Sequence, residues 1–337
     1  GFIGGSITQG SLSSTPQTCY AYRVYTWWKE TFPQAEFVYC NAGIGGTTSE
    51  FGAARVGTDL LAERPDFVIV EFSVNDESTE HFKETYEGLV RKILGAAWNP
   101  AVLLVHNVFY HNGANAQVMH AAIGRHYDLP SVSMQNSIYP EVVAGRIENR
   151  AITPDDLHPN DEGHALVASV ITYFLEQVRS GKLTGSNASF ALGAKLPVPL
   201  TKNAYEDSVR IRNAAAPDMA GLQQPTLDGF TPDETAQNEI TDCFRYGWTA
   251  KKTGDAITFL VEGSCIAVQY RKSVKLPAPV ALAVVDDDTA PESAASVRIW
   301  HLDFRENMRR RRAPIFWTGR WRDSCERSMK CDGFFQL

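Results

Sequence analysis

Short hydrophobic runs alternate with longer amphipathic segments over the first 180 positions of the chain. The runs are short enough to be strands and apolar enough to be buried on both faces, and they lie at 1–4, 35–41, 66–73, 101–108 and 130–134. The segments with helical periodicity predict helices at about 17–31, 49–63, 79–96, 114–127 and 161–179. Strands that alternate with helices predict a parallel sheet with helices on both faces, a three-layer α/β/α sandwich of the flavodoxin-like kind.

The pattern changes after Gly181. Residues 182–204 are rich in Gly, Ser and Pro and predict a linker. Beyond them, turn residues separate short alternating segments, which is typical of a β-sandwich, at 208–213, 256–263, 264–272 and 279–288. The sequence therefore predicts an α/β domain over residues 1–181 and a smaller β-sandwich over 205–297, which is incomplete if the residues after it are not genuine.

The last forty residues differ from the rest in composition. Residues 1–297 carry 22 Lys and Arg against 34 Asp and Glu, a net charge of −12, whereas residues 298–337 carry 10 against 5, a net charge of +5. This tail contains the run Arg309–Arg312 and keeps no period of 2 or 3.6. A basic arm for nucleic acid and a shifted reading frame both explain it. We favour the shifted frame and assign the tail no function.

The net charge and the cysteine pattern indicate which partners and which cellular compartment to expect. The net charge of −7 gives no sign of nucleic acid as a partner, and no apolar stretch reaches the roughly 18 residues that span a bilayer. The six cysteines form no CxxC pair and no metal-ligand spacing, so we expect buried thiols in a reducing compartment, the cytoplasm rather than a secreted location. The chain starts without Met at the end of a predicted strand, so we expect further residues upstream and leave secretion open.

Ser6 follows two glycines where the first predicted strand turns into a helix. The unpaired N–H groups at a helix start favour negative charge, which suits a serine nucleophile, but Gly and Ser are also ordinary turn residues. The segment "GGSIT" is not the G-x-S-x-G elbow of the α/β-hydrolases, because Thr8 replaces the last glycine. On this segment alone, both interpretations stay open.

Two further motifs follow the next two strands. In "NAGIGGTTS", glycines such as Gly46 let the backbone turn sharply and approach a ligand, although a plain loop explains them equally well. In "EFSVNDES", Asn75 can cap the following helix or donate its amide N–H to a developing oxyanion. The carboxyl ends of the strands are where open sheets of this type place their sites.

Asp155 and His158 precede the last predicted helix in a turn flanked by prolines. A carboxylate three residues before a histidine can bond Nδ1 and leave Nε2 facing a serine. Asp161 and His164 repeat this spacing on the first turn of the helix, where Asp161 is interpreted as a cap and His164 as a packing or supporting residue. We favour the earlier pair as the functional one.

The order of these motifs over residues 1–180 resembles the four sequence blocks of the SGNH (GDSL-like) hydrolase family. The resemblance implies Ser6 as nucleophile, His158 as base and Asp155 as its partner. It also implies an oxyanion hole made by the amides of Ser6 and Gly46 and the side chain of Asn75. The implied activity is ester hydrolysis through an acyl-enzyme, with no metal and no cofactor.

Two positions depart from the family pattern. Gly5 stands where Asp is usual, which removes a carboxylate near the nucleophile. Ser73 stands where Gly is usual, which narrows the turn before Asn75. Neither change deletes a group of the implied catalytic machinery.

The motifs are most similar to the bacterial mannan acetylesterase type, and an SGNH domain followed by a β-sandwich resembles carbohydrate esterases with a carbohydrate-binding-like module. The resemblance implies a serine esterase that removes O-acetyl groups from plant-type oligosaccharides or polysaccharides, with an acetylated oligosaccharide as its partner. Phe109 and Tyr110, beyond the fourth strand, are the candidates for stacking on a sugar ring, whereas Trp27 and Trp28 are expected in the core.

Two alternative functions remain. The first is a lipid or thioester hydrolase with the same triad, which needs an apolar acyl channel that the sequence does not reveal. The second is a carbohydrate-binding protein whose hydrolase domain is inactive. Assembly into a homo-oligomer is also left open.

Overall fold

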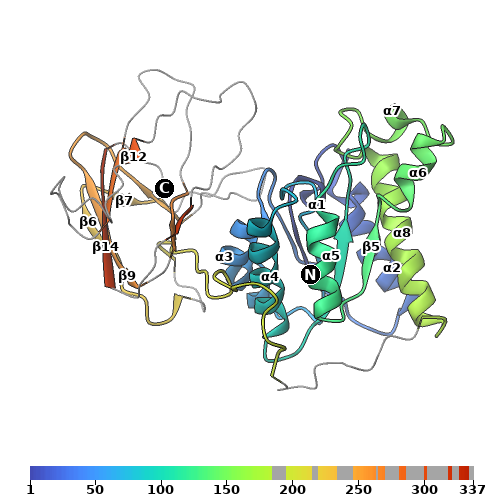
Figure 1. The fold of residues 1–337 in the computed structure, drawn as a ribbon, viewed down its shortest axis with the longest axis horizontal. Coiled ribbons are helices and arrows are strands. Elements are labelled where there is room, and N and C mark those ends of the chain that lie inside the picture. The colour runs from blue at the N-terminus through green and yellow to red at the C-terminus, as the bar shows by residue number, and fades with distance from the viewer. Residues whose placement is uncertain are drawn as a thin grey trace. The chain divides into compact units, whose positions relative to one another are not determined.

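The computed structural model describes residues 1–183, 195–214, 219–233, 246–262, 265–269, 281–285, 300–301, 318–320 and 326–333. The chain divides into two compact units, Gly1–Val209 and Arg210–Leu337 (Figure 1). Within the described residues, no helix is long and apolar enough to cross a bilayer.

A five-stranded parallel sheet forms the centre of the first unit, in the order β2-β1-β3-β4-β5. Its strands are β1 (Phe2–Gly4), β2 (Asn41–Gly43), β3 (Phe67–Glu71), β4 (Ala101–His106) and β5 (Ser131–Ser133). The strand order reverses at β1, which has β2 on one side and β3 on the other. Such a switch point is where open α/β sheets place their binding sites.

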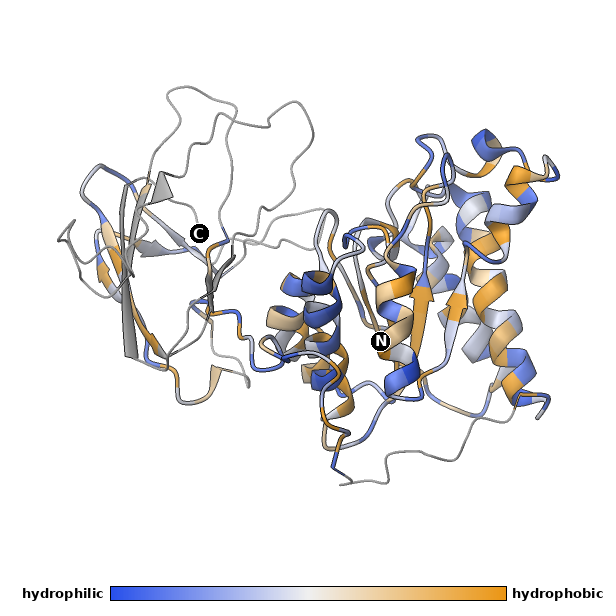
Figure 2. Cartoon of the chain, viewed as in Figure 1, coloured by the Kyte–Doolittle hydropathy of each residue, from blue (hydrophilic) through white to orange (hydrophobic). Residues whose placement is uncertain are grey.

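Helices cover both faces of this sheet, which confirms the predicted α/β/α fold class (Figure 1). One face carries α3 (Ser49–Asp59), α4 (Glu80–Leu94) and α5 (Gln117–His126), and the other carries α2 (Tyr20–Thr31) and α8 (Asp161–Arg179). Figure 2 shows that the central strands are hydrophobic, whereas the helices carry both polar and apolar residues. Burial of the strands on both faces explains their continuous apolar runs.

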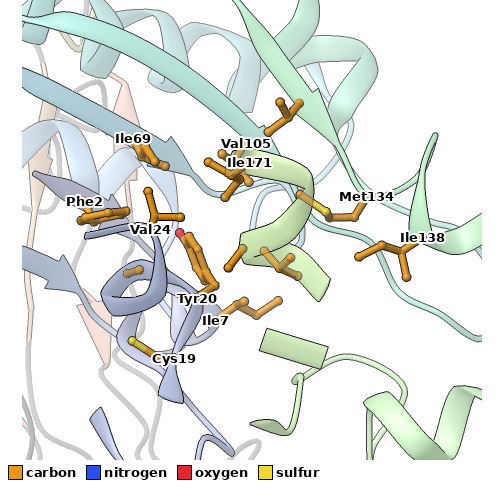
Figure 3. Close-up of a cluster of buried hydrophobic side chains, with 14 of the residues drawn as sticks. Phe2, Ile7, Cys19, Tyr20, Val24, Ile69, Val105, Met134, Ile138 and Ile171 are labelled. Atoms are coloured by element: carbon orange, nitrogen blue, oxygen red, sulfur yellow. The ribbon is translucent and has the colours of Figure 1, made fainter. Parts of the chain in front are cut away.

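Successive strand residues enter different cores. Val68 and Val70 of β3 pack with α3, α4 and α5, whereas Ile69 between them packs with α2 and α8. Figure 3 shows this second core, which includes Ile69, Val24 of α2 and Ile7 of α1 (Ser6–Gln9). The core therefore anchors the short helix that carries Ser6.

Several elements differ from the prediction. The second strand begins at Asn41 instead of residue 35. It pairs with β1 from Asn41 opposite Phe2 to Gly43 opposite Gly4. The sequence also missed α6 (Ile138–Val143) and α7 (Asn149–Ile152), which are too short to show a helical period.

Residues 195–209 belong to the first compact unit, although the sequence assigns them to the linker and the start of the β-sandwich. Glu87 of α4 accepts hydrogen bonds from the backbone N–H groups of Leu200 at 2.6 Å and Thr201 at 2.7 Å. One turn further along α4, Arg91 forms an ion pair with Glu206 at 2.6 Å. This part of the chain is therefore bonded along α4.

The described part of the second unit contains β6 (Thr226–Asp228), β7 (Thr231–Pro232), β8 (Trp248–Thr249), β9 (Ala256–Glu262), β10 (Cys265–Ala267), β11 (Ala281–Val285), β12 (Trp300–His301), β13 (Thr318–Arg320) and β14 (Glu326–Gly333). Five of them form an antiparallel sheet in the order β12-β11-β14-β9-β6, and β10 with β13 and β7 with β8 form two smaller sheets. The predicted second, β-rich domain is present, although 208–213, predicted as a strand, contains none.

Three of these strands come from the tail at 298–337. β14 lies between β9 and β11 in the sheet and pairs with β9 from Glu326 opposite Glu262 to Asp332 opposite Ala256. The arginine run Arg309–Arg312 lies outside the described residues. The tail thus supplies a central strand, which its composition did not indicate.

Candidate active site

Ser6 is the first residue of α1, which begins directly after β1. Its amide is one of the first-turn N–H groups that lack an acceptor within a helix. Ser6 is 8% exposed, and the following residue, Ile7, is buried in the core. The local fold therefore fixes Ser6 at the carboxyl edge of the sheet, beside the switch point.

The structure brings Ser6, His158 and Asp155 into one chain of hydrogen bonds. Ser6 Oγ lies 2.8 Å from His158 Nε2, and Nδ1 of the same ring lies 2.7 Å from Asp155 Oδ2. Because an ionised carboxylate only accepts, Nδ1–H donates to Asp155 and Nε2 accepts from the Ser6 hydroxyl. In this tautomer His158 can take the proton of Ser6.

The loop that carries Asp155 and His158 is held by the aspartate between them. Asp156 has a φ of 67°, in the left-handed region, and its carboxylate accepts a hydrogen bond from Arg150 at 2.7 Å. Its carbonyl oxygen accepts from the N–H of Tyr110 at 2.8 Å. The loop turns so tightly that Asp155 Oδ1 also accepts from the backbone N–H of His158 at 2.8 Å.

Two opposing effects act on the pKa of Asp155. Partial burial raises this pKa, but hydrogen bonds from the ring and the backbone of His158 lower it more, so that it lies below its ordinary value. Asp155 is therefore ionised at neutral pH. An ionised partner orients the imidazole and stabilises the imidazolium that forms when His158 takes a proton.

The glycine turn after β2 approaches Ser6 closely. A Cβ added to Gly45 would lie 3.5 Å from Ser6 Cβ, and the Gly45 N–H donates to Gln9 Oε1 at 2.8 Å, which ties the turn to α1. Gly46 has a φ of 71°, a conformation that favours glycine. Within the described part of the chain the Gly46 N–H has no hydrogen-bond acceptor, so it is free to donate to a substrate.

Asn75 lies in the turn after β3, where its N–H donates to Phe72 O at 3.0 Å. Its buried Oδ1 has no hydrogen-bond partner among the described residues and lies against Gly5, where an added Cβ would approach it to 2.0 Å. With Oδ1 turned toward Gly5, Nδ2 is the group left to donate. A side chain at position 5 would therefore require the amide of Asn75 to move.

Ser73, the second departure, is fully buried. Its Oγ lies 3.2 Å from Glu71 Oε1 and 3.0 Å from Asn107 O, so the hydroxyl links the ends of β3 and β4. The pKa of Glu71 is raised to about 7, mainly by burial. The hydrogen bonds from Ser73 act in the opposite direction and lower this pKa. Ser73 therefore supplies hydrogen-bond donors to the carboxyl group of Glu71, which is buried away from solvent.

The structure does not bring the second Asp-x-x-His pair together. Asp161 accepts from the N–H of Ser14 at 2.8 Å, and His164 Nδ1 accepts from the N–H of Tyr20 at 3.2 Å. The cap of α8 is Asn160, whose side chain accepts from the N–H three residues further on. The interpretation of Asp161 as the cap is therefore wrong, whereas His164 does support the structure around α2.

The two aromatic candidates for sugar stacking differ in exposure. Tyr110 is only 5% exposed and belongs to the hydrophobic core, so its ring offers no face to a ligand. Burial alone raises the pKa of its hydroxyl above the ordinary range. Phe109 is half-buried and lies 5.8 Å from the ring of His111. Of these two candidates, Phe109 is the one that keeps an accessible surface for a sugar ring.

A buried Asp–His pair next to the site was missed by the sequence analysis. Asp76 directly follows Asn75, and its Oδ2 lies 2.9 Å from His120 Nε2 with both side chains fully buried. No local motif could reveal this pair, because 44 positions separate its members. Among the described residues, no group of three or more His, Cys, Asp or Glu side chains could hold a metal ion.

Known proteins resemble this chain at two levels. The profile of the GDSL-like lipase/acylhydrolase family matches residues 2–166. A crystal structure of a two-domain esterase (CEX) active on acetylated mannans, co-crystallised with mannopentaose, is 57% identical, with a TM-score of 0.83 over 98% of this chain and 84% of the esterase. A second crystal structure of this esterase is 58% identical, with a TM-score of 0.84 and the same coverage.

A more distant likeness is to Axe2, an acetylxylan esterase from Geobacillus stearothermophilus. The two chains are 20% identical with a TM-score of 0.42, over 51% of this chain and 91% of Axe2, which is too little to carry an argument. No curated protein matches the chain.

Proposed function

The chain belongs to the GDSL-like lipase/acylhydrolase family and is a carboxylic ester hydrolase; from this premise we propose that it removes O-acetyl groups from mannan-type oligosaccharides or polysaccharides. In this proposal Ser6 is the nucleophile, His158 the general base and Asp155 the partner of the base. The hydrogen-bonded chain from Ser6 Oγ through His158 to Asp155 is the observation that carries it. The proposed substrate class is supported by the 57% identity to an esterase active on acetylated mannans.

In the first half-reaction Ser6 Oγ attacks the carbonyl carbon of the acetyl ester while its proton passes to His158 Nε2. The tetrahedral oxyanion is held by the N–H groups of Ser6 and Gly46 and by Asn75 Nδ2. The bond to the sugar oxygen then breaks, and this oxygen takes the proton from the His158 imidazolium. The products are a deacetylated sugar hydroxyl and an acetyl ester on Ser6.

In the second half-reaction water replaces the sugar. His158 Nε2 accepts a proton from water as the water oxygen attacks the acetyl group, and the same oxyanion donors hold the second tetrahedral intermediate. Its collapse releases acetate and returns the proton from His158 to Ser6 Oγ. Asp155 remains ionised in both halves, so it holds the imidazolium without taking its proton.

Acetate release tests the proposal. The purified chain is incubated with acetylated mannooligosaccharides, acetylated xylooligosaccharides and p-nitrophenyl esters of increasing acyl length. We expect release of acetate from the mannan fragments, a preference for acetyl over longer acyl groups, and complete loss with Ser6→Ala. Ser13→Ala is the matched control, because Ser13 Oγ donates only to the nearby Gly10 O.

Each alternative function gives its own result in this assay. A preference for long acyl chains would replace the proposal with a lipid or thioester hydrolase. Binding of mannooligosaccharide without acetate release would replace it with a carbohydrate-binding protein that has an inactive hydrolase domain. Equal acetate release by Ser6→Ala would remove Ser6 from the mechanism.

A further inference from the structure

We infer that the buried Asp76–His120 pair is a positioning device for the oxyanion hole, in which the Asp76 carboxylate joins the segments that carry Asn75 and Gly46 and His120 keeps that carboxylate in place. The inference rests on the proposed function, because it is the proposed function that assigns oxyanion binding to the segments of Asn75 and Gly46. Neither Asp76 nor His120 is expected to touch the substrate.

The two oxygens of Asp76 bind different parts of the fold. Oδ1 accepts a hydrogen bond from the N–H of Ser49 at 2.9 Å, and Ser49 is the first residue of α3, three positions after Gly46. Oδ2 lies 2.9 Å from Nε2 of His120 in α5. Since Asp76 follows Asn75 directly, one carboxylate connects both proposed oxyanion segments and anchors them to a third element.

The backbone around Asp76 is tied at the same place. The N–H groups of Asn75 and Asp76 both donate to Phe72 O, at 3.0 and 2.9 Å, which closes a tight turn at the end of β3. The N–H of Ala116, just before α5, donates to Ser73 O at 2.7 Å. The turn is therefore fixed to the start of α5, and the side chain of Asp76 is the link that extends this connection to α3.

Burial makes the partner of Asp76 necessary. Asp76 and His120 have side chains without solvent exposure, and the His120 ring stacks on Tyr86 at a centroid distance of 3.6 Å and an angle of 4°. The Ser49 N–H pairs only Oδ1 of the carboxylate, and a buried carboxylate oxygen without a donor carries a desolvation penalty. His120 Nε2–H supplies that donor, while Nδ1 is buried and has no hydrogen-bond partner among the described residues. Loss of His120 would leave Oδ2 unpaired and free the turn to shift.

Two variants of similar size separate positioning from packing. His120→Gln keeps an amide N–H that can donate to Asp76, whereas His120→Met fills the same space without a donor. With p-nitrophenyl acetate we expect His120→Met to lower kcat roughly tenfold or more with little change in KM, because a misplaced donor loses part of the roughly hundredfold to thousandfold effect of an oxyanion contact. His120→Gln should recover most of this loss.

A double-mutant cycle identifies the route of the effect. If His120 acts through the oxyanion hole, His120→Met lowers kcat much less in an Asn75→Ala background than in the wild-type chain. Tyr127→Phe is the control for buried polar packing, because the Tyr127 hydroxyl donates to Glu87 Oε1 at 2.6 Å and both residues are buried. This control should lower the melting temperature and leave kcat unchanged.

The outcomes distinguish the two proposals. No Ser6-dependent acetate release by the wild-type chain would overturn the proposed function. A fully active wild-type chain in which His120→Gln and His120→Met have equal kcat would overturn only the positioning inference. The positioning inference would also be overturned if the loss of kcat in the double variant equalled the product of the losses in His120→Met and Asn75→Ala.

Discussion

Two segments with the same Asp-x-x-His spacing, only six positions apart, have different structures in this chain. In the first, Asp155 and His158 are bonded to each other at 2.7 Å, and the ring reaches Ser6. In the second, Asp161 bonds Ser14 and His164 bonds the backbone of Tyr20, so the two side chains are not partners. Identical spacing therefore does not produce identical geometry.

The backbone makes the difference. Asp155 and His158 lie in a loop that Asp156 turns with its left-handed φ of 67°, so the carboxylate can bond both the ring and the backbone N–H of His158. Asp161 and His164 lie on the first turn of α8, where the helix fixes the direction of each side chain. An Asp-x-x-His motif forms a hydrogen-bonded pair only when the loop conformation permits it.

The largest expected effect separates the two histidines. We expect His158→Ala to lower kcat by roughly ten-thousandfold or more, because the proton of Ser6 then has no acceptor. We expect His164→Ala to leave kcat within a factor of about three, since this ring bonds the backbone of Tyr20 and Ser11 and not the hydroxyl of Ser6. Initial rates with p-nitrophenyl acetate measure both; comparable losses would show that the second histidine also takes part in the reaction.

The second-largest expected difference is between the effects on kcat of replacing Asp155 and Asp161. Asp155→Asn is expected to lower kcat roughly a thousandfold, because the amide no longer stabilises the imidazolium or fixes its tautomer. Asp161→Asn should leave kcat unchanged, since its partner is Ser14. Steady-state kinetics at saturating substrate provide the comparison. A small loss for Asp155→Asn would mean that another group orients His158.

Glu71 shows what burial does to a carboxyl group that has no histidine partner. Its pKa of about 7 in the folded chain exceeds the ordinary 4.5, chiefly through burial, so the folded state binds the proton more tightly between these values. The wild-type chain should therefore lose stability as pH rises from about 4.5 to 7, by at most about 3 kcal/mol. Glu71→Gln should reduce this slope in urea unfolding at pH 5 and pH 8. An unchanged slope would contradict the raised pKa.

The smallest effect concerns His164 and stability. Burial is the main cause that lowers the pKa of His164 to about 4, so the unfolded chain binds a proton between pH 6.5 and 4 and the folded chain does not. The wild-type chain should therefore lose stability as pH falls through this range. His164→Gln should weaken this dependence and cost about 1–2 kcal/mol at pH 7 through its altered hydrogen bonds. Thermal unfolding at pH 5 and pH 7 measures both.

Much of the first unit could be predicted from the sequence, because local patterns determine it. The buried strands and the amphipathic helices follow from hydrophobic periodicity, and Ser6, Gly46 and Asn75 follow strand ends that the parallel topology places at one edge. The Asp155–His158 dyad could also be predicted, because both members lie in one short loop. In the structure Asp155 and His158 are bonded to each other, whereas Asp161 and His164 of the repeat on α8 have other partners.

Contacts between distant positions were beyond the reach of local patterns. The Asp76–His120 pair joins residues 44 positions apart, and Thr201 bonds Glu87 across 114 positions. β2 is defined by its pairing with β1, and β14 by its pairing with β9 and β11. Such elements are set by their partners, which no periodicity in the segment itself reveals.

Direct capture of the acyl-enzyme tests the central claim, that His158 activates Ser6 as the nucleophile toward an acetyl ester. The chain is mixed with acetylated mannooligosaccharide, quenched in acid within one turnover, digested and analysed by mass spectrometry. The account predicts one acetyl group on the peptide that contains Ser6, and none in Ser6→Ala. Turnover at the wild-type rate with an acetyl group on another residue, or with Ser6 replaced, would contradict it.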